Sequence, residues 1–203
     1  RSLLGPFEFS VSLGIAVDAP EKMPLSLESA RNAMTERLIQ GTGRLLDTVP
    51  PGSGIEKQNL LDKYIKMMEH TVDSLSTAEA GEACRMLETE ALGLDRICGG
   101  EILELVLSAG RLFIARTALS NVEEIQQEFV NGCSQCRTAG ELFGQLARIQ
   151  ERLLSEAREL RSSEAARPIR IAKQYVMQHY QEPITLETVC EDIGFSVNYF
   201  STL

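Results

Sequence analysis

The chain has 203 residues, a formal net charge of −9 and five cysteines. This length allows one or two domains with a buried core. The acidic balance argues against nucleic-acid binding by the chain as a whole, because neutralising phosphates requires a basic surface. No apolar run approaches the roughly 20 residues that span a bilayer, and no segment resembles a signal peptide. An odd number of cysteines scattered over helical stretches is typical of reduced thiols, so we expect a cytoplasmic protein.

The first 49 residues predict a small α/β piece. Residues 7–17 alternate large apolar groups with small or polar ones, which is typical of a strand. A helix is expected from Ser26 to Ile39, with Ser26 as its N-cap. Its predicted buried stripe consists of Leu27, Ala30, Ala33, Met34 and Leu38. Gly41 and Gly43 end this helix, and residues 44–47 predict a short returning strand.

This order of strand, helix, Gly-x-Gly and strand over residues 7–47 resembles the C-terminal part of a GGDEF-like module. In that family a Ser-x-Gly-Ile-Ala strand, here Ser12 to Ala16, precedes an Ala-rich helix. The same order resembles the segment between receiver and AraC-type output in many two-component response regulators. The Gly-Gly-Asp-Glu-Phe signature is missing, so the resemblance implies a degenerate module without cyclase activity. An alternative is a degenerate nucleotide-binding module over residues 1–49, whose phosphate loop would have to precede Arg1.

Residues 50–54 read Pro-Pro-Gly-Ser-Gly and predict a linker, after which residues 55–163 predict a helical region. One helix starts at Ile55, Thr77 is expected to cap a second, and Asn121 a fourth over residues 122–130. The third, from Glu101 to Leu119, is apolar nearly all round in its first half, so we expect it at the centre of a bundle. The predicted core positions of the first two helices are Leu60, Leu61, Tyr64, Ile65, Met68, Val72, Leu75, Ala80, Ala83, Cys84 and Leu87.

A long helix is expected after Thr138, where Thr138 and Glu141 have the spacing of a capping box. Its apolar residues recur close to a heptad over about three turns: Leu142, Phe143, Leu146, Ile149, Leu153, Leu154 and Leu160. This seam predicts either pairing with a second copy of the chain or one helix of an internal bundle. Residues 161–164 are interpreted as a hinge into the last part of the chain.

Residues 164–203 predict a helix, a tight turn and a further helix. Thr185 is the expected N-cap, and Leu186, Val189, Cys190 and Ile193 form one apolar face. Gly194 stands where a C-terminal cap needs a left-handed residue, and Ser196 begins the next helix. Phe200 and Leu203 are expected to fold inward. Two short helices joined by a Gly-containing turn form the helix-turn-helix unit that enters the DNA major groove.

The order of residues over 171–180 and 184–203 resembles the first half of an AraC-family DNA-binding domain. That family has two helix-turn-helix units, so the resemblance implies that this chain stops inside the first recognition helix and lacks the second unit. The positions that match the family's base-reading residues are Asn198, Ser201 and Thr202, with Val197 also outward; Thr185, Ser196 and Tyr199 are better placed for phosphates. Residues 165–203 hold three basic and four acidic residues, so we expect this fragment to bind DNA weakly or not at all.

Cys133 and Cys136 have the one spacing that is typical of metal or redox sites. Without a second Cys or His pair, and without a βαβ context, packing is the better interpretation. The sequence offers no Ser-His-Asp set, phosphate-cradling loop or paired carboxylates, so we predict no enzyme activity, no cofactor and no metal site.

Together these patterns predict an α+β fold that is predominantly helical, with domains at 1–49, 50–163 and 164–203. The resemblance implies a homodimeric AraC-type regulator, whose middle region relays phosphorylation of an upstream receiver by a sensor histidine kinase. The alternative is a regulator whose helices between Ile55 and Leu119 enclose a small-molecule effector. Such a pocket would be lined by Met67, Met68, Leu105 and Phe113.

Overall fold

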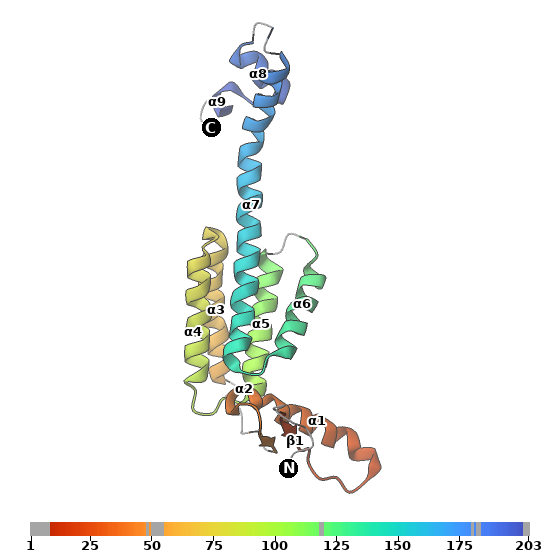
Figure 1. The fold of residues 1–203 in the computed structure, drawn as a ribbon. Helices are drawn as coiled ribbons and strands as arrows, with labels where there is room; N and C mark the ends of the chain where they lie inside the picture. The colour runs from red at the N-terminus through yellow and green to blue at the C-terminus, as the bar shows by residue number, and fades with distance from the viewer. Residues whose placement is uncertain are drawn as a thin grey trace. The chain divides into compact units, whose positions relative to one another are not determined.

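The computed structural model describes residues 9–47, 49, 55–117, 120–179, 181 and 184–200, apart from the side chains of Ile55, Glu56, Ala165 and Tyr199. The described part is predominantly helical and contains a two-stranded parallel sheet, which confirms the predicted mostly helical class (Figure 1). The chain divides into two compact units, unit 1 over residues 1–155 and unit 2 over residues 156–203. The predicted limit at 163/164 therefore lies eight residues inside unit 2.

The sheet of unit 1 consists of β1 (Val11–Ser12) and β2 (Leu45–Leu46), with Val11 opposite Leu45. The predicted returning strand is therefore confirmed. The strand predicted over residues 7–17 is wrong in extent, because in its described part only two residues meet a partner strand. Residues 7 and 8 lie outside the described residues.

Between the strands lie a short 3₁₀ helix, η1 (Pro20–Lys22), and the helices α1 (Met23–Thr35) and α2 (Arg37–Gln40). The predicted start at Ser26 is wrong: α1 begins at Met23, with a proline in its first turn, where the missing amide costs no hydrogen bond. Ala33 and Leu38 are buried as predicted, but the Leu27 side chain is 53% exposed. The Ser29 hydroxyl of α1 accepts the amide of Ile15, three residues after β1, at 3.3 Å.

The junction between α1 and α2 ties this α/β piece to the helices that follow. Glu36 is buried, and its Oε1 accepts the amide of Gly99, the first residue of α5 (Gly99–Thr117), at 2.7 Å. Arg37 Nη2 donates at 3.1 Å to the carbonyl of Cys136, which follows α6 (Val122–Gln135). Helix starts leave amides unpaired and helix ends leave carbonyls unpaired. Two adjacent side chains of opposite charge therefore complement the start of one helix and the end of another.

One continuous hydrophobic core in unit 1 is shared by α3 (Ile55–Ser74), α4 (Thr77–Leu92), α5, α6 and the first part of α7 (Ala139–His179), and Leu38 of α2 joins it (Figure 1). Nine of the 19 residues of α5 are buried, and α5 packs against α1, α2, α3 and α6. The predicted central position of this helix is therefore confirmed. The predicted core positions Tyr64, Met68 and Leu87 are buried as well.

Two of the predicted helix caps are wrong by local geometry. Ser76, not Thr77, caps α4, and its hydroxyl accepts the Glu79 amide at 3.3 Å. Asn121 precedes α6 with φ 56° and makes no side-chain cap hydrogen bond. Its left-handed backbone replaces the extended conformation from which a capping side chain normally reaches the first turn.

The start of α7 bears out half of the predicted capping box. The Thr138 hydroxyl accepts the Glu141 amide at 3.2 Å, as expected. The Glu141 carboxylate instead accepts the amide of Arg137, one residue before the cap, at 2.7 Å. The Glu141 side chain therefore binds an amide one residue further back than the capping-box pattern predicts.

The leucine seam of α7 faces the interior of unit 1. Leu146 and Leu153 are 0% and 3% exposed, whereas Leu160 is 49% exposed. The structure thus supports the internal-bundle alternative and contradicts pairing with a second copy through these leucines. The hinge predicted at residues 161–164 is also wrong, since α7 runs through them without a break. Serine costs only a few tenths of a kcal/mol in a helix, and the proline of α7, Pro168, comes later.

A polar pair lies inside this core. Gln150 of α7 donates from Nε2 to the hydroxyl of Tyr64 on α3 at 2.6 Å, and both residues are at most 1% exposed. The Gln150 Oε1 atom has no hydrogen-bond partner among the described residues. Among all the residues that the structure describes, no helix is both long and apolar enough to cross a membrane.

We predict that the Tyr64 and Gln150 substitutions are strongly non-additive. Tyr64→Phe leaves the Gln150 carboxamide unpaired in the core and should cost about 1–3 kcal/mol. Gln150→Leu leaves the Tyr64 hydroxyl unpaired. The double variant removes both polar groups and should be close to wild type or more stable. Urea unfolding of the four proteins measures this cycle, and additive losses would contradict it.

A second prediction concerns the contact between α5 and α6. A Cβ at Gly110 would lie 2.1 Å from the Phe129 ring, so Gly110→Ala should destabilise unit 1 by about 1–3 kcal/mol through overpacking. Gly81→Ala in α4 is the matched control, because its Cβ would meet only the Arg85 guanidinium at 3.4 Å. The control should gain up to about 1 kcal/mol from helix propensity. Equal shifts of the urea midpoint in both variants would contradict the close packing.

Candidate nucleic-acid interface

In unit 2, α8 (Leu186–Ile193) begins with a reciprocal cap. The Thr185 hydroxyl accepts the Thr188 amide at 3.3 Å, and the Thr188 hydroxyl accepts the Thr185 amide at 3.0 Å. Two amides that a helix start would leave open are therefore satisfied by two threonines. The prediction of Thr185 as N-cap is confirmed.

The end of α8 is a sharp left-handed turn. Gly194 has φ 74° and ψ 28°, and the Phe195 amide donates to the Cys190 carbonyl at 3.0 Å. This six-residue closure is a Schellman-type helix end, which requires a residue with positive φ. The predicted role of Gly194 is therefore confirmed. The chain then enters α9 (Val197–Phe200), where the Phe200 amide donates to the Ser196 carbonyl at 3.0 Å.

The seven predicted DNA-binding residues divide into three groups. Thr185, Ser196 and Asn198 are exposed, the first at the start of α8 and the other two at the start of α9. Val197 is partly buried, as are Phe195 and Phe200, so its predicted outward position stays a prediction. Ser201, Thr202 and the side chain of Tyr199 lie outside the described residues, as does Leu203.

The apolar face of α8 is narrower than predicted. Val189 and Cys190 are buried and Ile193 is partly buried, but Leu186 is 43% exposed. The described residues pack against the second half of α8, so its first turn extends past the covered surface. Cys190, at 1% exposure, fills the packing role predicted for it.

The second half of α7 and the α8–α9 turn enclose a shallow hollow of about 370 Å³. Its walls are formed by Glu164, Arg167, Pro168 and Ile171 of α7 and by Ile193 and Phe195. The helix carries exposed Arg167, Arg170 and Lys173, whereas α8 carries exposed Glu187, Glu191 and Asp192. Positive and negative side chains are therefore nearly equal in number in unit 2, and the positive ones lie on α7.

The Cys133–Cys136 pair has the properties of packing residues. Both thiols are buried, and burial raises the pKa of Cys133 to about 12, with the neighbouring Cys136 thiol adding to the shift. Burial also raises the pKa of Cys136. Thiols that stay protonated are poor nucleophiles and poor metal ligands. Among the described residues, no group of three or more His, Cys, Asp and Glu side chains is arranged to hold a metal ion.

The residues proposed to line an effector pocket are used as core instead. Met68, Leu105 and Phe113 are buried in the continuous core of unit 1, and Met67 packs against it. Leu105 lines one side of a small surface hollow of about 90 Å³, next to the Lys57–Glu104 ion pair. In the described part of the chain these four side chains therefore contribute to the packed core of unit 1.

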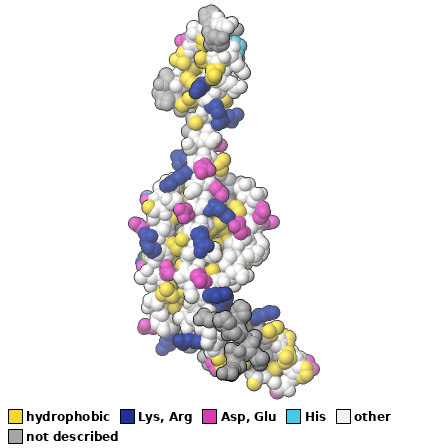
Figure 2. All heavy atoms as spheres, viewed as in Figure 1, with side chains coloured by type: hydrophobic (Ala, Val, Ile, Leu, Met, Phe, Trp, Pro, Cys, Tyr) yellow, Lys and Arg dark blue, Asp and Glu magenta, His cyan; other side chains and the backbone are white. Residues whose placement is uncertain are grey.

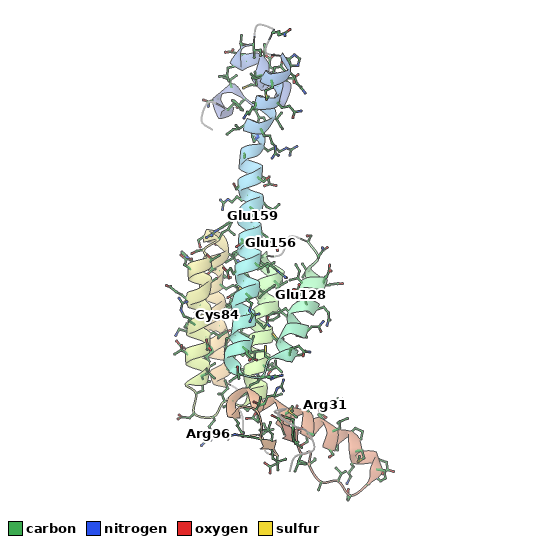
Figure 3. The ribbon with its side chains drawn as sticks, in the orientation of Figure 1. Arg31, Cys84, Arg96, Glu128, Glu156 and Glu159 are labelled. Carbon is green, nitrogen blue, oxygen red and sulfur yellow. The ribbon has the colours of Figure 1, made fainter. Side chains whose placement is uncertain are left out.

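A larger groove, which the sequence did not indicate, lies between α6 and α7. Its volume is about 320 Å³, and Arg152 of α7 approaches Glu128 of α6 across it, with Nη1 2.9 Å from Oε1 and 3.0 Å from Oε2 (Figure 3 labels Glu128). The hydrogen bond from Arg152 lowers the pKa of Glu128. The heptad pattern places Arg152 on the outer side of α7, so no periodicity signals this cross-helix contact.

Comparisons with family models, with curated proteins and with solved structures find no match to this chain. The residues and their geometry are therefore the basis of any functional assignment.

We predict that Gly194→Ala destabilises the α8–α9 turn specifically. A Cβ at Gly194 meets no atom within 4 Å, so the cost is the left-handed backbone alone, about 1–2 kcal/mol. Hydrogen exchange of the Phe195 amide should accelerate roughly 5–30-fold, since its acceptor belongs to the closure of α8. Gly194→Asn should restore part of the protection.

The matched control is Gly144→Ala in unit 1, whose Cβ would meet only the Arg148 guanidinium at 3.9 Å. It should leave exchange of the Phe195 amide unchanged. Equal protection of this amide in wild type and Gly194→Ala would show that the turn does not depend on the left-handed residue.

Proposed function

We propose that the chain is the central region and the start of the output domain of a sequence-specific, AraC-type transcription regulator. The observation that carries this proposal is the succession of α8, the left-handed Gly194 turn and α9 behind the long helix α7. Short helices joined by a Gly-containing turn are the helix-turn-helix unit, whose second helix enters the major groove. The reciprocal cap of α8 and the buried Cys190 support a packed, specific unit rather than a loop.

The exposed residues at the start of α9 have suitable chemistry for reading DNA. Recognition helices contact base edges through their N-terminal residues, and Asn198 lies in the first turn of α9. An asparagine carboxamide can bond N6 and N7 of adenine at once. Ser196 and Thr185, at helix starts, are suited to phosphate contacts. Ser201, Thr202 and Tyr199 keep their predicted roles within this proposal.

In the proposed regulator, unit 1 relays the state of an upstream receiver, phosphorylated by a sensor histidine kinase, to unit 2. The Glu36–Arg37 junction supports this role, because one short segment contacts both the start of α5 and the end of α6. The proposed regulator is a homodimer. Its proposed location is the cytoplasm, where it would reach the DNA. The contact of the homodimer lies outside the Leu146–Leu153 face, which the bundle already covers.

The proposal is tested by Asn198→Ala in the full-length protein. Selection from randomised duplexes, at one stated salt concentration, should yield a motif for the wild type. The variant should lose about 1–3 kcal/mol at one base position and accept other bases there. Asn131→Ala, which changes an exposed asparagine of α6, is the control and should keep the wild-type motif.

Two results would contradict the proposal in different ways. Equal weakening on all sequences would reduce Asn198 to a backbone-positioning residue. Failure of the wild type to enrich any motif would reject sequence-specific DNA binding.

A further inference from the structure

The groove between α6 and α7 has the composition of a small-ligand site. Phe129 and Ile149, 5% and 7% exposed, form an apolar floor. The rim is polar and consists of Glu128 of α6 with Gln145, Arg148 and Arg152 of α7. A volume of about 320 Å³ falls in the range of small-molecule sites, which are typically apolar hollows with a few convergent polar groups.

The two arginines of the rim lie four residues apart on α7, so they are neighbours on one face of the helix. Arg152 already holds a carboxylate, because its Nη1 lies within 3.0 Å of both oxygens of Glu128. Arg148 is exposed and forms no ion pair within the described part of the chain. Guanidinium groups match the geometry of carboxylates. Arg148 therefore offers a second position for a carboxylate on this rim, in addition to the one that Glu128 occupies at Arg152.

The Glu128 carboxylate is replaceable. Its side chain is 64% exposed and that of Arg152 is 38% exposed. Exposed ion pairs contribute little to stability, so an incoming anion can take the place of Glu128 without a large loss. The Glu128 carboxylate thus occupies a position that a ligand carboxylate can share or take over.

We propose that this groove binds a small organic carboxylate with an apolar body. The carboxylate lies between Arg148 and Arg152, and the apolar part covers Phe129 and Ile149. Gln145 also lines the groove and supplies a neutral polar group to its rim. The site does not depend on DNA binding by unit 2, and it differs from the pocket expected around Met68 and Phe113.

The experiment is a titration of the 203-residue chain with benzoate at low salt, followed by isothermal calorimetry and by amide shifts of α6 and α7. Acetate supplies the charge without the apolar body, and benzyl alcohol supplies the ring without the charge. Benzoate should bind saturably and at least fivefold more tightly than either. Inorganic phosphate tests whether the site selects any anion, and it should bind at least fivefold more weakly than benzoate.

Variants separate a binding role from a structural one. Arg148→Gln and Arg152→Gln should each weaken benzoate binding at least fivefold. Glu128→Gln should tighten it at least twofold, because it removes the competing carboxylate, although it also removes the ion pair with Arg152. Arg111→Gln, at an exposed position of α5, is the matched control and should leave the affinity unchanged.

The proposal is overturned if benzoate binds no better than acetate and benzyl alcohol, or if Arg148→Gln keeps the wild-type affinity. Phosphate binding as tight as benzoate would remove the apolar body from the proposal. Weaker benzoate binding in Glu128→Gln would show that the ion pair only supports the fold. None of these results bears on the DNA-selection experiment, so each proposal can fail without the other.

Discussion

The hydrogen bond between Gln150 and Tyr64 fixes the register of α7 in the bundle. Each residue along a helix turns by about 100°, so a shift by one position would separate the carboxamide from the hydroxyl and leave both buried and unpaired. The same shift would turn Leu146 and Leu153 away from the core. In the N-terminal α/β piece, exposed hydrophobic side chains gather over α1, where Met23 and Leu25 are both more than half exposed (Figure 2).

Features that depend on local chemistry were predictable from the sequence. Helical periodicity identified the core positions Tyr64 and Met68 of α3 and Leu87 of α4, because one-sided burial against neighbours leaves a 3.6-residue pattern in a helix. The Thr185 cap and the left-handed Gly194 were predictable because the partners of each lie within a few residues. The buried positions Val189 and Cys190, in the second half of α8, were predictable from their helical spacing.

Features that depend on residues far apart in the chain were not predictable. The Glu36 carboxylate meets an amide 63 residues away, and Arg152 meets a carboxylate 24 residues away. No spacing rule connects such pairs. The leucines of α7 present a different problem, since a heptad is the same whether its partner helix belongs to the same chain or to a second copy. Leu27 and Leu186 were predicted as buried because the pattern of a helix does not reveal how much of its apolar face a neighbour covers.

The most direct test of the account is to map DNA contacts on the isotope-labelled 203-residue chain by amide chemical shifts. A mixed-sequence duplex at low salt is sufficient, because sequence-independent binding at about 10⁻⁴ M is within reach of the method. The account predicts salt-sensitive shifts at Thr185, Ser196 and Asn198, and unchanged amides in α3 and α4. Shifts confined to unit 1 would contradict the assignment of α8 and α9 as the DNA-contacting surface.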